Sequence, residues 1–323
     1  MTAWLLSGLG LVILLLAGDA LVKGAVNLSL RLGVPALIVS LTIVSFGTSA
    51  PELLISINAV LEGKPGLALG NVVGSNTANI LLVLGVPALL ATLHTSRSQT
   101  RKSYVMMVMA SVLFVALAFR GQFDILAGGV LLAGLAIMLS DALLEARAHR
   151  AAIAEMPEDM SAGPFDEDVE GADPDMPWWQ ILLFLGLGLV GLPLGADLLV
   201  DNASIIAKRY GVSDAVIGLT LVAIGTSLPE LATTVMAALR QQADVAVGNV
   251  IGSNMFNLLA IIGVTCFVGT IPVDQAFLRF DLWVMLGATL LLAPFVFMKQ
   301  DITRLWGVGL TALYGAYILL VLT

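Results

Sequence analysis

The chain has 323 residues, of which 59% are hydrophobic and only 12% are charged. Soluble domains carry about 25% charged residues, so this composition excludes an ordinary soluble protein and indicates a polytopic membrane protein. A net charge of −8 without a Lys/Arg cluster also excludes a nucleic-acid partner.

Ten apolar segments follow one another along the chain, each long enough to cross a bilayer core of roughly 30 Å. The first begins without a basic region and continues into further apolar sequence, so it is interpreted as a membrane helix and not as a cleaved signal. The ten predicted helices lie at 3–30, 35–61, 67–92, 103–119, 123–141, 179–208, 212–239, 245–271, 280–298 and 304–322.

An acidic stretch separates the first five segments from the last five. Nine acidic residues and no basic one lie between Glu155 and Asp175, together with several prolines. The stretch lacks the ligand spacing of an EF-hand loop, so it is interpreted as a solvated linker and not as a regulatory Ca²⁺ site. We predict a first five-helix repeat at 1–144, an acidic linker at 145–177 and a second five-helix repeat at 178–323.

The basic residues predict the orientation. With the N-terminus outside, nine Lys/Arg fall in cytoplasmic loops and five in outer loops, which is the bias of the positive-inside rule. We therefore predict an inner-membrane protein with both termini on the periplasmic side and the linker in the cytoplasm. The cytoplasmic set is Arg31, Arg97, Arg101, Lys102, Arg147, Arg150, Arg240, Lys299 and Arg304; the outer set is Lys64, Arg120, Lys208, Arg209 and Arg279.

Two polar motifs occur twice, at a constant offset of 178 residues. GTSAPEL at 47–53 recurs as GTSLPEL at 225–231, and GNVVGSN at 70–76 recurs as GNVIGSN at 248–254. Without a gap, 23 of the 53 positions from 33 to 85 match their counterparts. Because each half has an odd number of predicted crossings, the second enters the membrane from the opposite side. This is the inverted repeat of many secondary transporters, whose substrate site lies near the midplane.

Each repeat places one glutamate, Glu52 or Glu230, inside an apolar segment. An intramembrane carboxylate is costly and indicates a functional site by default. No Lys or Arg lies within the second, third, seventh or eighth segments to pair with them. A bound cation is therefore the simplest partner, whereas duplication for packing alone leaves two retained polar clusters unexplained.

The neighbours of the glutamates add oxygen ligands. Thr48 and Ser49 share a helix face with Glu52, and Pro51 lacks the N–H that a helical carbonyl would need. Thr226 and Ser227 repeat this arrangement before Glu230. Oxygen-only ligation suits hard cations such as Ca²⁺ and Na⁺. Two carboxylates neutralise one Ca²⁺ or two monovalent ions, and this competition is the physical basis of exchange.

The second motif of each half adds a polar stripe at helical spacing. Its predicted ligands are Ser75 and Asn79 in the first repeat and Ser253 and Asn257 in the second. Four further asparagines are left open between ligation and contacts between helices: Asn71, Asn76, Asn249 and Asn254.

GTSxPE followed by GNxxGSNxxN, twice at equal spacing, resembles the α-repeats of the calcium/cation antiporter superfamily, in particular the prokaryotic sodium/calcium exchangers. The resemblance covers about 19–85 and 197–263 and implies an all-α fold of ten helices in two inverted repeats. It implies Ca²⁺ ligation by both glutamates, Na⁺ sites shared with the hydroxyls and amides, and backbone ligands near Ser45 and Ala223. The long first and sixth helices, carrying Asp19 and Asp197, would be a sliding gate pair.

One departure concerns the coupling ion. Sodium/calcium exchangers of this kind carry an Asp at one of the positions matched by Asn79 and Asn257, whereas this chain has Asn at both. The expected function is secondary active exchange of Ca²⁺ for Na⁺, with a Ca²⁺/H⁺ or K⁺-dependent antiporter as the alternative. A passive channel and an intramembrane enzyme are disfavoured. The transported ions bind as substrates, and we expect neither a resident cofactor nor an obligatory protein partner.

Overall fold

The computed structural model describes residues 2–97, 100–154, 172–211 and 223–322, and nearly all of them are helical. The first half contains α1 (Thr2–Leu32), α2 (Ala36–Val39), η1 (Ser40–Val44), α3 (Ser45–Thr48), α4 (Ala50–Leu61), α5 (Pro65–Ala78), η2 (Asn79–Val83), α6 (Gly85–Leu90), η3 (Thr95–Arg97), α7 (Arg101–Ala118), β1 (Gln122–Phe123) and α8 (Ile125–Ala154).

The described residues of the second half also form long helices broken by short segments. It contains α9 (Trp178–Arg209), α11 (Ala223–Gly225), α12 (Leu228–Leu239), α13 (Ala243–Met255), η5 (Phe256–Ile261), α14 (Ile262–Val268), β2 (Ile271–Pro272), η6 (Phe277–Asp281), α15 (Leu282–Leu291), α16 (Ala293–Phe297) and α17 (Arg304–Leu322).

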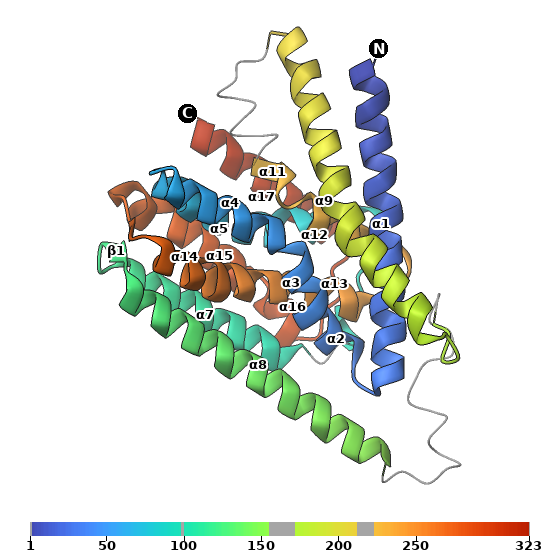
Figure 1. Cartoon of the computed structure of the whole chain (residues 1–323). Helices are drawn as coiled ribbons and strands as arrows, with labels where there is room; N and C mark the ends of the chain where they lie inside the picture. The colour runs from blue at the N-terminus through green and yellow to red at the C-terminus, as the bar shows by residue number, and fades with distance from the viewer. Residues whose placement is uncertain (1, 98–99, 155–171, 212–222, 323) are drawn as a thin grey trace.

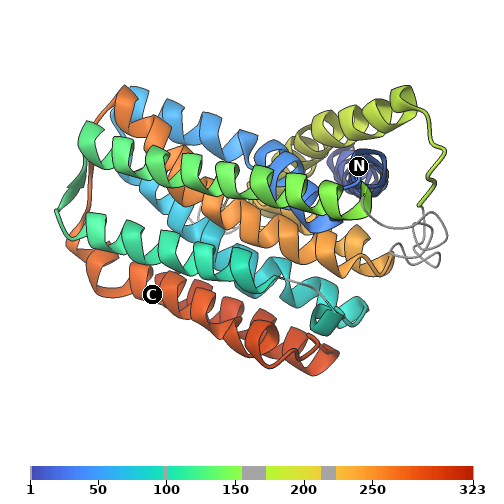
Figure 2. The same cartoon turned by 90° about the horizontal axis from the view of Figure 1, so that it is seen from below.

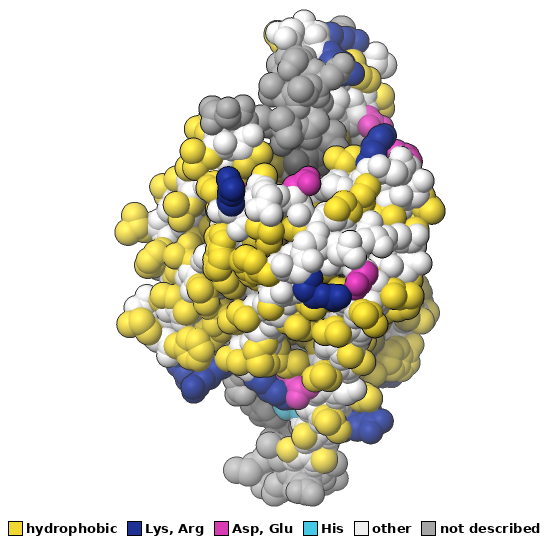
Figure 3. Space-filling view, turned by 90° about the vertical axis from the view of Figure 1, so that its left-hand side faces the viewer, with side chains coloured by type: hydrophobic (Ala, Val, Ile, Leu, Met, Phe, Trp, Pro, Cys, Tyr) yellow, Lys and Arg dark blue, Asp and Glu magenta, His cyan; other side chains and the backbone are white. Residues whose placement is uncertain are grey.

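Within the described residues, eight helices are long and apolar enough to span a membrane, or nine if the bent pair α2–α4 is counted as one span. These nine coincide with nine of the ten predicted segments. Part of the remaining one, 212–239, lies outside the described residues, and its described end contains α12. The predicted fifth segment ended at 141, whereas α8 continues to Ala154. Hydrophobic side chains cover much of the face seen in Figure 3, as expected for contact with lipid.

The spans over 65–90 and 243–268 form the buried centre of the molecule, since most of their residues are enclosed by other helices. Short contacts join the loops around this centre. β1 pairs with β2 in antiparallel register, and Leu93 forms an isolated antiparallel bridge with Ile302. The two halves of the chain are therefore interleaved around one core and are not packed as separate domains.

The long helices α1 and α9 lie side by side and are inclined steeply to the other helices (Figures 1 and 2). Their contact is lined by glycines that allow the backbones to approach. A Cβ at Gly188 would lie 2.5 Å from the Cβ of Leu21, and one at Gly195 would lie 2.9 Å from the backbone nitrogen of Leu14. Small residues at a helix interface are the usual device for close packing in a membrane.

Replacing Gly188 with Ala is expected to destabilise the protein by roughly 1–3 kcal/mol, because the methyl group must push α1 and α9 apart. Gly186, on the exposed side of the same helix, is the matched control. A Cβ there meets nothing within 4 Å, so Gly186→Ala should be neutral or stabilising by up to about 1 kcal/mol. Thermal unfolding in detergent measures both variants, and equal melting temperatures would contradict this description of the interface.

Candidate cation site

A break in the second membrane span places the first glutamate at the start of a helix. The segments Ala36–Thr48 and Ala50–Leu61 meet at an angle of 41°. Ser49 lies at this break, and Pro51 follows in the first turn of α4, where its missing N–H costs no helical bond. Glu52 stands in that same first turn and is fully buried. In the second half, Ser227 precedes α12, whose first turn contains Pro229 and the buried Glu230.

Glu230 receives hydroxyl groups from both halves of the chain. Ser49 Oγ donates to Glu230 Oε1 at 3.3 Å, and Ser253 Oγ approaches the same oxygen at 3.5 Å. Thr48 Oγ1 lies 3.4 Å from Ser253 Oγ and donates to Asn249 Oδ1 at 3.3 Å. The first motif of one repeat therefore meets both motifs of the other in a single buried cluster.

The carboxylate of Glu52 differs from that of Glu230 in its hydrogen bonding. Both oxygens of Glu52 are buried, and neither has a hydrogen-bond partner among the described residues. Glu230 Oε2, Ser75 Oγ and Ser227 Oγ are also buried without a partner in that part of the chain. Buried polar atoms are nearly always paired, so a group of orphaned oxygens indicates a ligand position.

Two π-helical turns carry the amides of the site. Asn79 is the first residue of η2, and Asn257 is the second residue of η5. A π turn is rare and often marks a functional position, because it re-aims the side chains of the turn that contains it. Among the described residues, neither polar atom of the buried Asn257 amide has a partner, and neither has Asn79 Oδ1.

The four asparagines left open by the sequence separate in the structure. Asn71 Nδ2 donates to the Glu52 carbonyl oxygen at 3.2 Å and to Ser56 Oγ, and Asn249 Nδ2 donates to Thr234 Oγ1 at 3.4 Å. Asn254 Oδ1 accepts from Asn79 Nδ2 at 3.0 Å. These three therefore join helices, whereas both polar atoms of the Asn76 side chain are buried without a partner among the described residues.

Of the remaining predicted positions, Ser45 contacts members of this cluster. Ser45 is buried, and its hydroxyl lies 2.8 Å from the backbone oxygen of Ser40 and 2.9 Å from that of Asn249. Its own carbonyl oxygen accepts from the Ser49 N–H and lies 3.3 Å from Thr48 Oγ1. Thr226 is half-buried just before Ser227, and Ala223 begins the short helix α11. The structure thus brings Ser49 and Ser253 to Glu230, with Thr48 beside Ser253.

No basic side chain neutralises the cluster within the described part of the chain. The ion pairs found there lie elsewhere, for example Lys102 with Asp141 and Arg240 with Asp19. Glu52 and Glu230 are close enough to repel each other when both are ionised. The arrangement is an oxygen-lined, acidic cage that a cation would stabilise.

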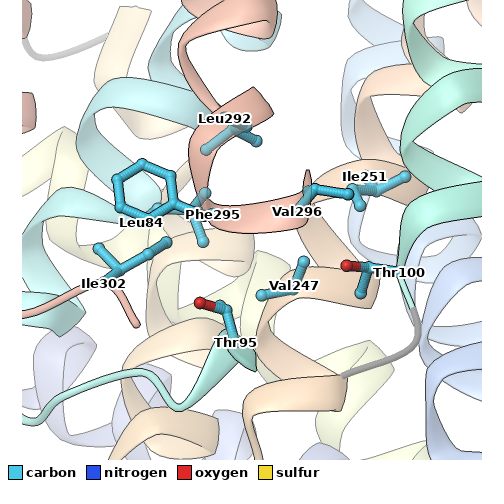
Figure 4. Close-up of a pocket in the computed structure, with 9 residues that line it drawn as sticks. All are labelled: Leu84, Thr95, Thr100, Val247, Ile251, Leu292, Phe295, Val296 and Ile302. Carbon is cyan, nitrogen blue, oxygen red and sulfur yellow. The ribbon is translucent and has the colours of Figure 1, made fainter. Parts of the chain in front are cut away.

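A separate small cavity does not belong to this cage. Figure 4 shows it between α13, α16 and the residues around η3, with an apolar lining apart from Thr95 and Thr100. Its volume is about 10 Å³, which leaves room for no more than about one water molecule. None of the described residues that line it is a carboxylate.

Two features of the site were not predicted from the sequence. The π turns η2 and η5 have no composition signal, although each follows a GSN triplet. The amide pair between Asn79 and Asn254 joins the two repeats, and only their crossing in space creates it.

A polytopic helical protein with a buried, oxygen-lined acidic cage belongs to the class of membrane cation transporters. The chain matches the sodium/calcium exchanger protein family over residues 2–140 and 180–323. It therefore belongs to the sodium/calcium exchanger family of membrane antiporters, which confirms the resemblance seen in the motifs. This is a family of transporters and not of enzymes.

Individual relatives cover almost the whole chain. The chain is 36% identical to the putative antiporter CaxA of Alkalimonas amylolytica over 88% of this chain and 86% of that protein. It is 32% identical to the sodium/calcium exchanger MaX1 of Methanosarcina acetivorans over 96% of this chain and 95% of that protein. Among solved structures, the sodium-calcium exchanger NCX_Mj, in crystals soaked with Na⁺ and Sr²⁺, matches with a TM-score of 0.80 and 29% identity over 98% of both chains.

Proposed function

We propose that this protein is a secondary active antiporter that exchanges Ca²⁺ for Na⁺ across the inner membrane. The observation that carries the proposal is the pair of fully buried glutamates, three of whose four carboxylate oxygens have no partner among the described residues. Oxygen ligands of this kind suit Ca²⁺ and Na⁺. One Ca²⁺ or two Na⁺ would balance the two charges, so the ions compete for the same cage.

We propose that the ligands come from both motifs of both repeats. Glu52 and Glu230 would bind Ca²⁺ directly, with the hydroxyl and amide oxygens completing the shell for Ca²⁺ or for Na⁺. The proposed set is Glu52, Glu230, Thr48, Ser49, Ser75, Asn79, Thr226, Ser227, Ser253 and Asn257, with backbone oxygens near Ser45 and Ala223. The Oδ1 atoms of Asn79 and Asn257 have no partner in the part of the chain that the structure describes, which supports including the amides.

Alternating access would follow from the repeat. We propose that the two halves, 1–144 and 178–323, are inverted five-helix repeats joined by a cytoplasmic linker, with both termini periplasmic. Because the two repeats have opposite orientations, each could adopt the conformation of the other. That change would expose the cage first to one side of the membrane and then to the other. An ion-free cage with two unpaired charges resists occlusion, and this would couple the two fluxes.

Ion flux in inverted vesicles tests the coupling ion. With protons clamped, an imposed Na⁺ gradient is expected to drive Ca²⁺ uptake, and K⁺ is expected to have no effect. Uptake driven only by a pH gradient would replace the Na⁺ proposal with Ca²⁺/H⁺ exchange, and uptake that needs K⁺ would make the carrier K⁺-dependent. Vesicles containing Glu230→Gln provide the background rate.

A further inference from the structure

The long helices α1 and α9, which we propose as the gate pair, cover the two repeats to different extents. Gly18 of α1 lies directly against α12, where a Cβ on Gly18 would be 3.0 Å from the backbone of Ala232. Ala232 is 7% exposed and Thr233 is 0% exposed. Their repeat counterparts on α4, offset by 178 residues, are Leu54 at 63% and Ile55 at 42% exposure. The face of α4 that corresponds to the covered face of α12 is therefore open.

An ion pair lies beside the contact between α1 and α12. Arg240 ends α12, and its Nε donates to Asp19 Oδ1 on α1 at 2.6 Å. The Arg240 and Asp19 side chains are only 20% and 31% exposed, so the pair is poorly screened by solvent. It joins a gate helix to the repeat that carries Glu230, across 221 residues of sequence.

The offset of 178 residues identifies the side chains that would meet if α9 packed on α4, the counterpart of the contact between α1 and α12. Asp19 corresponds to Asp197 on α9, but Arg240 corresponds to Glu62 on the turn after α4. If α9 packed on α4 as α1 packs on α12, Asp197 would face a like charge. The neighbouring Lys64 is bound to Glu62 at 3.0 Å, and both side chains are about 60% exposed. Opposite charges meet where α1 packs on α12, and like charges would meet if α9 packed on α4.

We infer that the Asp19–Arg240 ion pair is a latch that biases the carrier toward the state seen here, with no equivalent latch at the other gate. This rests on the alternating access of the proposed function. The latch breaks each time α1 leaves α12, and Glu62 adds repulsion when α9 approaches α4. The two access states are therefore unequally populated in the absence of ions, and residues 62 and 240 determine the ratio.

Disulfide formation between α4 and α9 reports the opposite state. The counterpart of the Gly18–Ala232 contact is Ala196 with Leu54, so cysteines at 54 and 196 would come within bonding distance only when α9 covers α4. Cys266, the only native cysteine, is buried and is first replaced by Ala. The cross-linking rate of the full-length protein in ion-free vesicles then measures how often that state is visited.

Arg240→Gln is expected to raise the cross-linking rate about threefold or more, because the latch is removed. Glu62→Arg should also raise it, because Asp197 then meets an opposite charge. Glu62 is exposed on a turn, so this variant tests the idea even if Arg240→Gln fails to fold. Asp19→Asn should also raise the rate, because it removes the acidic partner of the same ion pair. Lys102→Gln, which breaks an exposed ion pair away from both gates, is the matched control and should leave the rate unchanged.

Two outcomes would overturn the latch and can be told apart. If the cysteine pair cross-links during transport but Arg240→Gln and Glu62→Arg leave the rate unchanged, the latch is wrong and alternating access stands. If the pair never cross-links while Ca²⁺ is still transported, α9 does not close on α4, and the proposed gating is wrong together with the latch.

Discussion

Glu52→Gln and Glu230→Gln are each expected to lower Ca²⁺ transport at least ~100-fold while leaving the folded protein intact. Gln has the shape of Glu but lacks its charge, so a cage with one carboxylate can no longer neutralise Ca²⁺. Neither oxygen of the Glu52 carboxylate has a partner among the described residues, so the substitution there breaks no hydrogen bond of that side chain. Burying a neutral amide in place of an unpaired charge should also be tolerated by the fold.

Two measurements separate loss of binding from loss of structure. Ca²⁺ should raise the melting temperature of the wild-type protein, because a ligand that binds only the folded state stabilises it. This rise should vanish in both variants, while the ion-free melting temperature stays equal or increases. Glu145→Gln, on the exposed surface of α8, is the matched control and should retain both transport and the Ca²⁺ response. Normal transport by either cage variant would falsify the central assignment.

Asn257→Asp is expected to tighten Ca²⁺ binding at least ~10-fold, whereas Asn79→Asp should gain less or lose affinity. Both polar atoms of the Asn257 side chain are buried without a partner among the described residues, so a third carboxylate there breaks no hydrogen bond. At position 79 the donor to Asn254 Oδ1 would be lost, and two acceptors would face each other. Rotating the Asn254 amide cannot repair this without losing its bond to the Asn76 carbonyl oxygen.

The two variants also predict a change in coupling. A cage with three carboxylates is balanced by three Na⁺, so Asn257→Asp should raise the number of Na⁺ exchanged for each Ca²⁺. Ca²⁺-dependent thermal shifts measure the affinity, and the Na⁺ gradient that just balances a Ca²⁺ gradient in vesicles measures the ratio. Equal behaviour of Asn79→Asp, Asn257→Asp and the wild type would show that neither amide is a ligand.

Local chemistry made much of the site predictable. Glutamates inside apolar segments with no basic residue nearby in the sequence indicate a bound cation. This inference needs no tertiary structure, because the free-energy cost of burying the carboxylate comes from the apolar segment itself. The spacing of Ser49 from Glu52 and of Ser75 from Asn79 follows from helical periodicity. The repetition of both motifs at one offset predicted that the two halves contribute equivalent groups. All of these arguments use residues that are close in sequence.

Contacts between the halves were beyond such reasoning. Ser49 was expected to share a helix face with Glu52, three residues away, but its hydroxyl donates to Glu230 in the other repeat. The Asn79–Asn254 pair and the Asp19–Arg240 pair likewise join residues from opposite halves. Their formation depends on how η2 packs on α13 and how α1 packs on α12, which is determined by side-chain packing over the whole core.

The sequence by itself determined the membrane class, the repeated motifs and the identity of the two buried carboxylates, because composition, periodicity and charge act locally along the chain. Only the tertiary structure decided that the two glutamates are not equivalent. Glu230 is hydrogen-bonded, whereas the carboxylate of Glu52 is unpaired within the described residues. Two nearly identical motifs acquire different surroundings because Ser49 donates to Glu230, whereas Ser227, its counterpart in the second repeat, has no partner among the described residues.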